Sequence, residues 1–505
     1  MASDRGTQPV LLPTDARDLL AADHAAWAYL GLVEELDLTA FCAAYRADGR
    51  GRPPYDPAMM VALLLYCASK GYYKAQEIET ACHDDLGCRV ITGNRFPDDG
   101  TIGRFRDRHA QALRGLLSQS LRLCDAAGLV DLALVAGDGT KIAANAAMAA
   151  TIDQATLQAR IAGLRALVAD LDTAWQSSVT ADDGDQMTLL DLPARPPAGH
   201  GPAWRRLLRA RAVLGAHEAA LAQLLAEPGS EHTAWSQRLD RDRARVAAAH
   251  TRLAATRERV QATHTRRAQR QAAGQPVPGP RPVPVDDHCH VRQATKALQT
   301  ATARAAATAA SPPPRGKVNI TDPSSRIMPS KHGGYDQLFN VEICACPGQI
   351  ILAILRHPNS ADTQALPELL RQTRANADAA GIHHQIGTAL FDAGYPSQAN
   401  FTAELPVTTL LVALPPATAQ HPHPEAWQPM ADRLTMPAHR AAYARRSGII
   451  EPVFAQLLNH FGRDLISRGD AADTELHLWA TSHNLAKLLR HRTHNHRPVT
   501  ANPPG

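Results

Sequence analysis

Three acidic side chains stand in settings that could hold a divalent metal ion. Asp138 ends the apolar run Leu132-Ala-Leu-Val-Ala-Gly, and Asp392 ends the apolar run Thr388-Ala-Leu-Phe. Glu451 lies in a basic segment with the pattern of a helix. Carboxylate oxygens are ligands that Mg²⁺ prefers, and two metal ions held by carboxylates can cut and rejoin phosphodiester bonds. We therefore take these three acids as a candidate catalytic and metal-binding set.

Each acid also has an ordinary structural interpretation. An Asp before Gly, as at Asp138, most often serves as a turn residue. Glu451 could be a solvated acid on a helix surface, and other acids could take its place: Glu404, Glu425 and Glu475. The settings of the two aspartates still favour a metal site, because a strand end holds a carboxylate rigidly.

The elements that would position these acids divide the chain into three parts. Helical spacing predicts a helical N-terminal domain at residues 1–130, with Asp56-Pro57 as the start of one helix. A second helix is predicted from Asp99 to about residue 127. Strand patterns predict a mixed α/β domain formed by residues 131–150 with 316–495, and a helical insert at 151–315 between its two pieces.

The α/β part shows alternating strand and helix signals after the insert. Strands are predicted at 318–321, 339–344, 349–355, 388–391 and 408–414. Helices are predicted at 361–381, 437–462 and 473–491. On one helix, Tyr443 and Arg446 would share a face and could grip a phosphate by hydrogen bonds. The fold class is therefore mixed α and β, with strands and helices in one layered domain.

The insert has the composition of long exposed helices. Leu and Ile recur every three or four residues in stretches rich in Ala, Arg and Glu, at 153–178, 203–227 and 232–273. This pattern predicts an antiparallel coiled-coil hairpin. Four arginines of the third stretch could contact phosphates: Arg238, Arg241, Arg243 and Arg245. A segment rich in Gly and Pro at 274–284 then interrupts the helices.

Composition excludes several classes of protein. A chain of 505 residues with 45% hydrophobic residues can form two or three globular domains. The net charge of +4 is a weak indication of nucleic acid, so a basic surface must be local. No secretory signal and no apolar stretch long enough to span a membrane are present. We expect a cytoplasmic protein with reduced thiols.

Six stretches of the chain resemble the DDE transposases of bacterial insertion sequences, specifically insertion-sequence family 1182. They occur in the order of that family and span most of the chain. The stretches are Asp56-Pro-Ala-Met-Met-Val-Ala-Leu-Leu-Leu-Tyr, Phe96-Pro-Asp-Asp-Gly-Thr-Ile-Gly-Arg-Phe, Asp138-Gly-Thr-Lys-Ile-Ala-Ala-Asn, Asn319-Ile-Thr-Asp-Pro-Ser-Ser-Arg-Ile-Met, Asp392-Ala-Gly-Tyr and Glu451-Pro-Val-Phe-Ala-Gln.

The resemblance implies an RNase-H-like catalytic domain that holds two Mg²⁺ or Mn²⁺ ions with Asp138, Asp392 and Glu451. It implies double-stranded DNA as the partner, both as terminal inverted repeats and as target, and assembly as a homodimer or larger synaptic complex. A bacterial cytoplasmic, nucleoid-associated location follows. The basic residues and the tyrosine that would contact DNA are Arg104, Arg106, Arg326, Lys331, Tyr443 and Arg446.

The chain departs from the family at one position. Relatives carry a Lys seven residues after the catalytic Glu, where this chain has Leu458. This departure favours a copy that has lost activity, and the metal chemistry is shared with nucleases, so two other functions stay open beside transposition. One is an RNase-H-like nuclease that cuts without strand transfer, and the other is a decayed transposase that only binds DNA. For the N-terminal and insert arginines, an ordinary solvated helix surface also remains an alternative.

Overall fold

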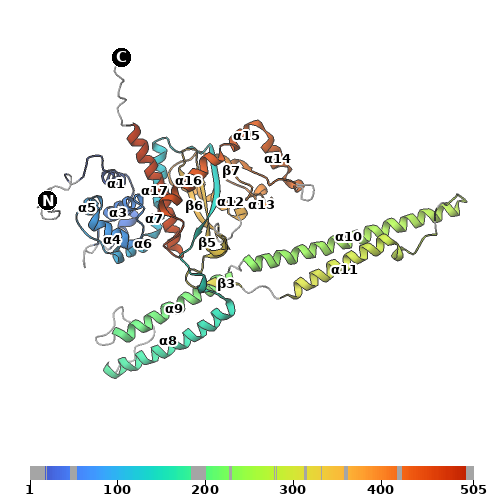
Figure 1. Cartoon of the computed structure of the whole chain (residues 1–505), viewed down its shortest axis with the longest axis horizontal. Coiled ribbons are helices and arrows are strands. Elements are labelled where there is room, and N and C mark those ends of the chain that lie inside the picture. Colours follow the sequence, from blue (N-terminus) through green and yellow to red (C-terminus); the bar gives the residue numbers. More distant parts are fainter. Residues whose placement is uncertain are drawn as a thin grey trace, which may run out of the picture. The chain divides into compact units, whose positions relative to one another are not determined.

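The computed structural model describes residues 18–495 except for 19, 46–53, 184–200, 227–229, 278, 280, 312–315, 331–332, 358–361 and 418–422. The chain forms two compact units (Figure 1). We call Met1–Met148 with Ser324–Gly505 the sheet unit, and Ala149–Pro323 the insert unit. The N-terminal helices and the sheet thus lie in one compact unit, and their separate action as domains stays a prediction.

The sheet unit is built on a six-stranded mixed sheet. Its strands are β1 (Leu134–Ala143), β4 (Arg326–Pro329), β5 (Tyr335–Ala345), β6 (Ile351–His357), β7 (Ile386–Phe391) and β8 (Val407–Val412). β1 pairs antiparallel with β5 on one side and parallel with β7 on the other. β8 lies parallel to β7, while β4 and β6 both pair antiparallel with β5. Apart from β4, the sequence predicts each of these strands.

Helices cover both faces of this sheet. Residues 134–137 of β1 and 351–354 of β6 are all buried, although successive side chains point to opposite faces. α12 (Leu366–Ala379) and α17 (Asp470–Asn495) pack against β6, and α16 (Arg446–Phe461) packs against β1 and β5. The central strands are thus held rigidly between layers.

The N-terminal part is helical, as predicted. Its helices are α1 (Ala25–Glu34), α2 (Thr39–Cys42), α3 (Pro57–Ser69), α4 (Ala75–Asp84), α5 (Leu86–Ile91), α6 (Asp99–Arg108) and α7 (Ala110–Ala126). Asp56 caps α3 by accepting a hydrogen bond from the backbone of Ala58. The single helix predicted from Asp99 is wrong, because the backbone leaves the helical conformation at His109.

The C-terminal helices also differ in one place from the prediction. Beside α16 and α17 they are α13 (Gln398–Thr402), α14 (Gln428–Thr435) and α15 (Pro437–Tyr443). The helix predicted at 437–462 is two helices, since α15 ends at Tyr443 and α16 begins at Arg446. Tyr443 and Arg446 therefore stand on either side of a break rather than on one helical face.

The insert unit consists of two helical hairpins and a small sheet. α8 (Gln154–Asp183) packs against α9 (Gly201–Ala226), and α10 (Ser230–Ala272) packs against α11 (Cys289–Ala310). β2 (Thr151–Asp153) pairs antiparallel with β3 (Lys317–Asn319). The sequence predicts the β3 region as a strand of the main α/β domain, which is wrong, because its partner is β2. The described residues of this unit are mostly helical, and both the domain boundaries of the insert and its coiled-coil geometry stay predictions.

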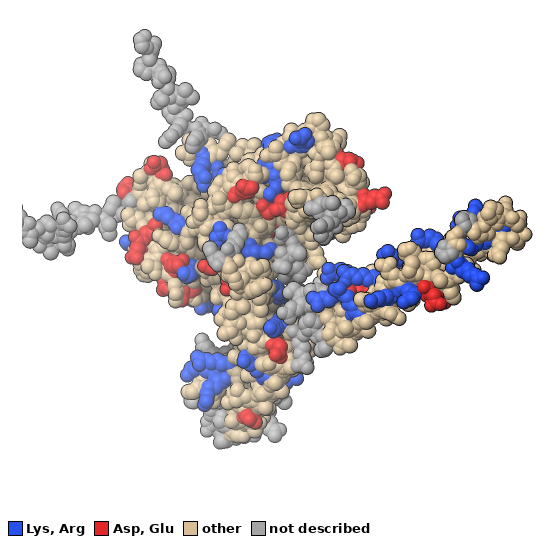
Figure 2. Space-filling model, turned by 45° about the vertical axis from the view of Figure 1, so that its right-hand side comes forward, with Lys and Arg blue, Asp and Glu red and all other residues tan. Residues whose placement is uncertain are grey.

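Basic side chains follow the α10–α11 hairpin (Figure 2). Arg238 and Arg241 are exposed. Arg245 instead lies 3.0 Å from the carboxylate of Asp242, which is 1% exposed and also pairs with Arg304 at 3.2 Å. The predicted arginine stretch is thus partly engaged within its own hairpin. In the parts of the chain that the structure describes, no helix is long and apolar enough to cross a membrane.

Candidate active site

Asp138 lies on β1, and Asp392 directly follows the neighbouring parallel strand β7. The register pairs Ala136 of β1 with Leu390 of β7, so two residues further along each strand Asp138 is level with Asp392. β7 ends one residue before Asp392, which confirms that this acid follows a strand. The prediction that the other strand ends at Asp138 is wrong, because pairing with β5 carries β1 on to Ala143.

Glycines on either side of Asp138 let bulky groups approach β1. A Cβ on Gly137 would come within 2.3 Å of the Phe391 ring, and a Cβ on Gly139 within 2.8 Å of the Glu342 carboxylate. Successive side chains of a strand point to opposite faces. Asp138 therefore projects from the face opposite to Gly137 and Gly139. A side chain at either glycine would therefore force Phe391, Glu342 or β1 itself to move.

A buried hydrogen bond ties the loop after Asp392 to β5. The Tyr395 hydroxyl donates to the Glu342 carboxylate, and Nδ2 of Asn340 donates to the same carboxylate at 2.8 Å. Tyr395 and Glu342 are both fully buried. The backbone N–H of Gly394 donates to Asp392 at 2.8 Å. The turn that begins at Asp392 is thus fixed at both of its ends.

Sequence reasoning missed Glu342 and gave Tyr395 no role. The available signal was an acid inside the apolar run Val341-Glu-Ile-Cys, since a Glu is almost never fully buried without a partner. Glu342 stands opposite Gly139 in the antiparallel register, and so it lies on the other face of the sheet from Asp138. We therefore assign it to positioning and not to metal binding.

Tyr443 and Arg446 reach the two aspartates from the junction of α15 and α16. Nη1 of Arg446 lies 3.2 Å from Oδ2 of Asp138, and their side chains are 14% and 21% exposed. The Tyr443 hydroxyl donates to the backbone carbonyl of Phe391 at 3.1 Å, directly before Asp392. The structure thus brings four predicted residues together, which we call the acid site: Asp138, Asp392, Tyr443 and Arg446.

Burial and charge act in opposite directions on this group. Burial raises the pKa of the Asp138 carboxyl, Arg446 lowers it, and the nearby Asp392 raises it, which leaves the pKa above its ordinary value. For Arg446, burial lowers the pKa while the attraction of Asp138 raises it, and the pKa lies above its ordinary value. Arg446 therefore does not fully offset the cost of burying the Asp138 carboxylate, and a further cation beside Asp138 would stabilise its charged form.

Glu451 does not join the acid site. It is exposed on α16, whereas Ile450 and Val453 of the same helix are buried against the core. Five residues after Arg446, Glu451 lies well around the helix from it, at 100° per residue. Within the described residues, no three acidic, histidine or cysteine side chains are grouped to hold a metal ion. The role of Glu451 as third ligand stays a prediction.

The donor set fits a hard divalent cation only in part. Asp138 and Asp392 offer carboxylate oxygens on neighbouring strands, which suits Mg²⁺ or Mn²⁺. Arg446 already occupies one of those oxygens, so the position beside Asp138 accommodates positive charge. The two aspartates are therefore the residues that would hold a metal ion, and a third ligand is not assembled beside them among the described side chains.

The remaining predicted DNA contacts lie elsewhere. The Arg104 side chain is 72% exposed on α6. Arg106 stacks on the ring of Tyr73 at 4.1 Å and donates to its carbonyl at 2.6 Å, so its guanidinium is engaged within the unit. Arg326 lies on β4 and donates to the carbonyl of the preceding residue. Lys331 lies outside the described residues.

Two family matches cover the parts of the chain that carry these residues. Residues 15–108 match a family described as transposase domain (DUF772). Residues 330–485 match a family described as transposase DDE domain, which includes Asp392, Tyr443, Arg446 and Glu451. Asp138 lies outside both matched ranges. A search of curated proteins and a search of solved structures each found no match to the chain.

Proposed function

Since this chain belongs to the DDE transposases of insertion sequences, we propose that it cuts and rejoins DNA at the ends of a mobile element with a divalent metal ion at the acid site. The observation that carries the proposal is the placement of Asp138 and Asp392 level with each other on parallel strands. Arg446 beside them adds a cation for phosphate. The resemblance to insertion-sequence family 1182 belongs to the same proposal.

We further propose that the sheet is the core of an RNase-H-like domain. In the spatial order β6, β5, β1, β7 and β8, β5 runs antiparallel to both of its neighbours, β6 and β1, and β1, β7 and β8 run parallel to one another. This order supports the proposal because it places Asp138 of β1 beside the carboxyl end of β7, which Asp392 follows. The insert unit interrupts the chain between β1 and β4, as an independent element can do at small cost in loop entropy.

In the proposed mechanism, the acid site positions a phosphodiester and neutralises its charge. A metal ion held by Asp138 and Asp392 would lower the pKa of a bound water and stabilise charge on the phosphate. Arg446 would leave Asp138 and donate to a phosphate oxygen, since the same guanidinium edge suits either partner. Tyr443 holds the carbonyl before Asp392 and so fixes the direction of that carboxylate.

The proposed reaction has two steps, hydrolysis at the element end and transfer of the freed strand to the target. Water bonds to phosphorus at the element end, the bond from phosphorus to the 3′ oxygen breaks, and a 3′-hydroxyl is freed. That hydroxyl then attacks a target phosphodiester and frees a 3′-hydroxyl of the target. Terminal repeats and target are double-stranded DNA, and a homodimer or larger complex would bring the two element ends together.

A cleavage assay with labelled DNA tests the proposal. The substrate is a duplex with the terminal repeats that flank the gene, incubated with full-length protein and Mg²⁺ or Mn²⁺. We expect metal-dependent nicks at the repeat ends and joined products with a second duplex. Cleavage without joined products would indicate a nuclease. Binding without cleavage would indicate a decayed copy, for which the exposed Glu451 and the replacement Leu458 are the specific observations.

A further inference from the structure

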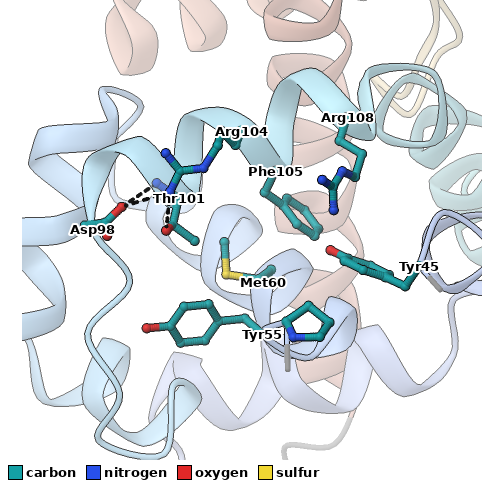
Figure 3. Close-up of a pocket in the computed structure, with 9 residues that line it drawn as sticks. Tyr45, Tyr55, Met60, Asp98, Thr101, Arg104, Phe105 and Arg108 are labelled. Carbon is teal, nitrogen blue, oxygen red and sulfur yellow. Dashed lines mark hydrogen bonds and ion pairs between the residues drawn. The ribbon is translucent and has the colours of Figure 1, made fainter. Parts of the chain in front are cut away.

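A pocket beneath α6 in the N-terminal part of the sheet unit has no role in the acid site. Its cavity volume is about 340 Å³, which lies within the range of small-ligand pockets of roughly 300–1,000 Å³. Figure 3 shows Arg104 and Arg108 on one side and Tyr45 and Tyr55 on the other. We call it the α6 pocket. The residues that line it include Tyr45, Tyr55, Met60, Asp98, Arg104 and Arg108.

Two of the six sequence stretches that mark the chain meet at this pocket. The stretch that begins at Phe96 supplies Arg104 and Phe105 from α6, and the stretch that begins at Asp56 supplies Met60 from α3. Met60 is fully buried and Phe105 is 6% exposed, so they form a firm apolar floor. Neither stretch contributes a residue to the acid site, but both contribute residues to the α6 pocket.

The two arginines of the pocket are available for a ligand. Arg104 and Arg108 are four residues apart on α6, so they lie on the same side of the helix with their Cβ atoms about 6 Å apart. Both are exposed. Arg104 is oriented by the Thr101 hydroxyl at 2.9 Å and by Asp98 at 3.6 Å. Arg106, between them, turns away onto Tyr73, so the charge on the pocket side comes from the other two.

Tyrosine rings face these arginines. The guanidinium of Arg108 lies over the Tyr45 ring, 5.5 Å from its centroid, and the Tyr45 hydroxyl is 3.1 Å from Nε2 of His109. Tyr55 is half-buried at the rim. Aromatic faces take nucleobases by stacking, while paired guanidiniums take phosphate oxygens. The pocket thus offers both kinds of contact within one small cavity.

We propose that the α6 pocket binds one unpaired nucleotide of a DNA strand, with its phosphate at Arg104 and Arg108 and its base against the Tyr55 ring. This inference rests on the proposed function, in that the chain acts on DNA. It adds a specific contact point away from the acid site, where an element end or target strand is held while the chemistry takes place elsewhere. Neither sugar nor base identity is read by arginine and tyrosine alone, so the contact is independent of sequence.

A single nucleotide with both of its phosphates is the direct probe. Deoxythymidine 3′,5′-bisphosphate is titrated into the full-length protein, and binding is followed by calorimetry. We expect saturable binding that weakens about tenfold in Arg104→Gln and in Arg108→Gln, through loss of charge-assisted hydrogen bonds. Tyr55→Leu should also weaken it about tenfold, through loss of stacking. Arg95→Ala, an exposed arginine outside the pocket, is the matched control and should bind as the wild type does.

Two comparisons make the test decisive. Inorganic phosphate and deoxythymidine should each bind more weakly than the bisphosphate, because each lacks one of the two contacts. Equal binding of phosphate and bisphosphate, or equal binding by all variants, would overturn the proposal. Neither arm depends on cleavage. If the protein cuts DNA but does not bind the bisphosphate, only the assignment of the α6 pocket is wrong. If it binds the bisphosphate at the pocket but does not cut DNA, the pocket assignment stands and the proposed function is wrong.

Discussion

The acid site and the α6 pocket both place an arginine beside an aspartate, but they hold the charge in different ways. At the acid site, the side chains of Arg446 and Asp138 are 14% and 21% exposed. In the pocket, those of Arg104 and Asp98 are 72% and 63% exposed. Water screens the pocket pair, whereas the acid-site pair lies in a region of lower effective dielectric, where each charge acts more strongly.

The acid site is also held more rigidly by its surroundings than the α6 pocket is. The strands of the acid site are locked from the far face of the sheet by Tyr395 and Glu342, and by a ring packed on Gly137. The pocket has a firm floor but an open rim. Chemistry requires reacting groups at fixed positions, while holding a backbone phosphate requires only accessible charge. The comparison therefore predicts that damage to the acid site stops cleavage, and that damage to the pocket weakens binding.

The largest expected effect is the loss of cleavage in Asp138→Asn. An amide keeps the shape of the carboxylate but binds a divalent cation poorly. Replacing a residue that only orients a metal ligand reduces activity by up to about 100-fold, so loss of the ligand itself should reduce cleavage by more than about 100-fold. Gel-shift affinity for the same duplex should change little. Glu34→Gln, at an exposed acid in the N-terminal helices, serves as the control. Cleavage that survives in Asp138→Asn removes this residue from the metal site.

The next effect separates the two arginines. Arg446→Ala should reduce cleavage about tenfold or more and leave duplex affinity nearly unchanged, because its guanidinium is engaged at the acid site. Arg104→Gln should do the reverse, and it should lower the slope of log affinity against log salt by about one. Both are measured by single-turnover cleavage and by gel shift at several salt concentrations. If the two variants behave alike, the division between the regions is wrong.

A smaller effect tests the rigid support of the acid site. Tyr395→Phe removes the hydroxyl that donates to buried Glu342, so cleavage should fall about tenfold, as for other supporting groups. The free energy of unfolding should fall by about 1–3 kcal/mol, because a buried carboxylate loses a donor. The concentration of Mn²⁺ needed for half-maximal cleavage should rise. Tyr335→Phe, at a ring that is 66% exposed, is the control. An unchanged Mn²⁺ requirement would leave Tyr395 a purely structural residue.

The smallest effect lies outside both regions and concerns pH. His483 is buried and donates to the carbonyl of Gln349 at 2.8 Å, and burial lowers its pKa to about 4. The unfolded chain takes up this proton below about pH 6.5, and the folded protein only near pH 4. The folded state is therefore favoured above pH 6.5, and stability is lost as pH falls from 6.5 to 4, by about 3 kcal/mol at most.

Denaturant unfolding of the wild type and of His483→Gln across this pH range checks that prediction. The variant should show a shallower loss of stability with acid, since its amide has no proton to gain. A residual slope is expected from His477, whose pKa burial also lowers. Identical slopes in the two proteins would contradict the assignment. DNA cleavage near neutral pH should not differ between them.

Local patterns in the sequence predicted much of the acid site, because strand signals before Asp392 and around Asp138 are local. The parallel pairing of β1 with β7 then brings Asp138 and Asp392 close together. Patterning did not reveal the tie between Tyr395 and Glu342, which depends on contact between two strands and a loop far apart in the chain. Nor did it reveal the break between α15 and α16, where no Gly or Pro marks the end of the first helix.

For two further residues, the prediction and the structure differ because tertiary packing decides where the side chain lies. The sequence pattern predicts a DNA contact for Arg104 and Arg106 alike. Arg106 instead stacks on the ring of Tyr73, which is 33 residues away in the chain and so lies outside any local pattern. Glu451 lies on its predicted helix but on the exposed side of it, because Ile449, Ile450 and Val453 take the core. The sequence identifies the helix, whereas packing decides which side faces the acids.

The most direct test of the central claim is the metal preference of Asp392→Cys. A thiolate is a soft ligand that suits Mg²⁺ poorly and softer divalent ions better. If Asp392 holds the metal ion, the full-length variant should lose cleavage in Mg²⁺ and regain a measurable part of it in Mn²⁺. Glu34→Cys, at an exposed acid in the N-terminal helices, should cleave equally well with both ions. Full activity of Asp392→Cys in Mg²⁺ would show that this carboxylate does not bind the ion and would contradict the account.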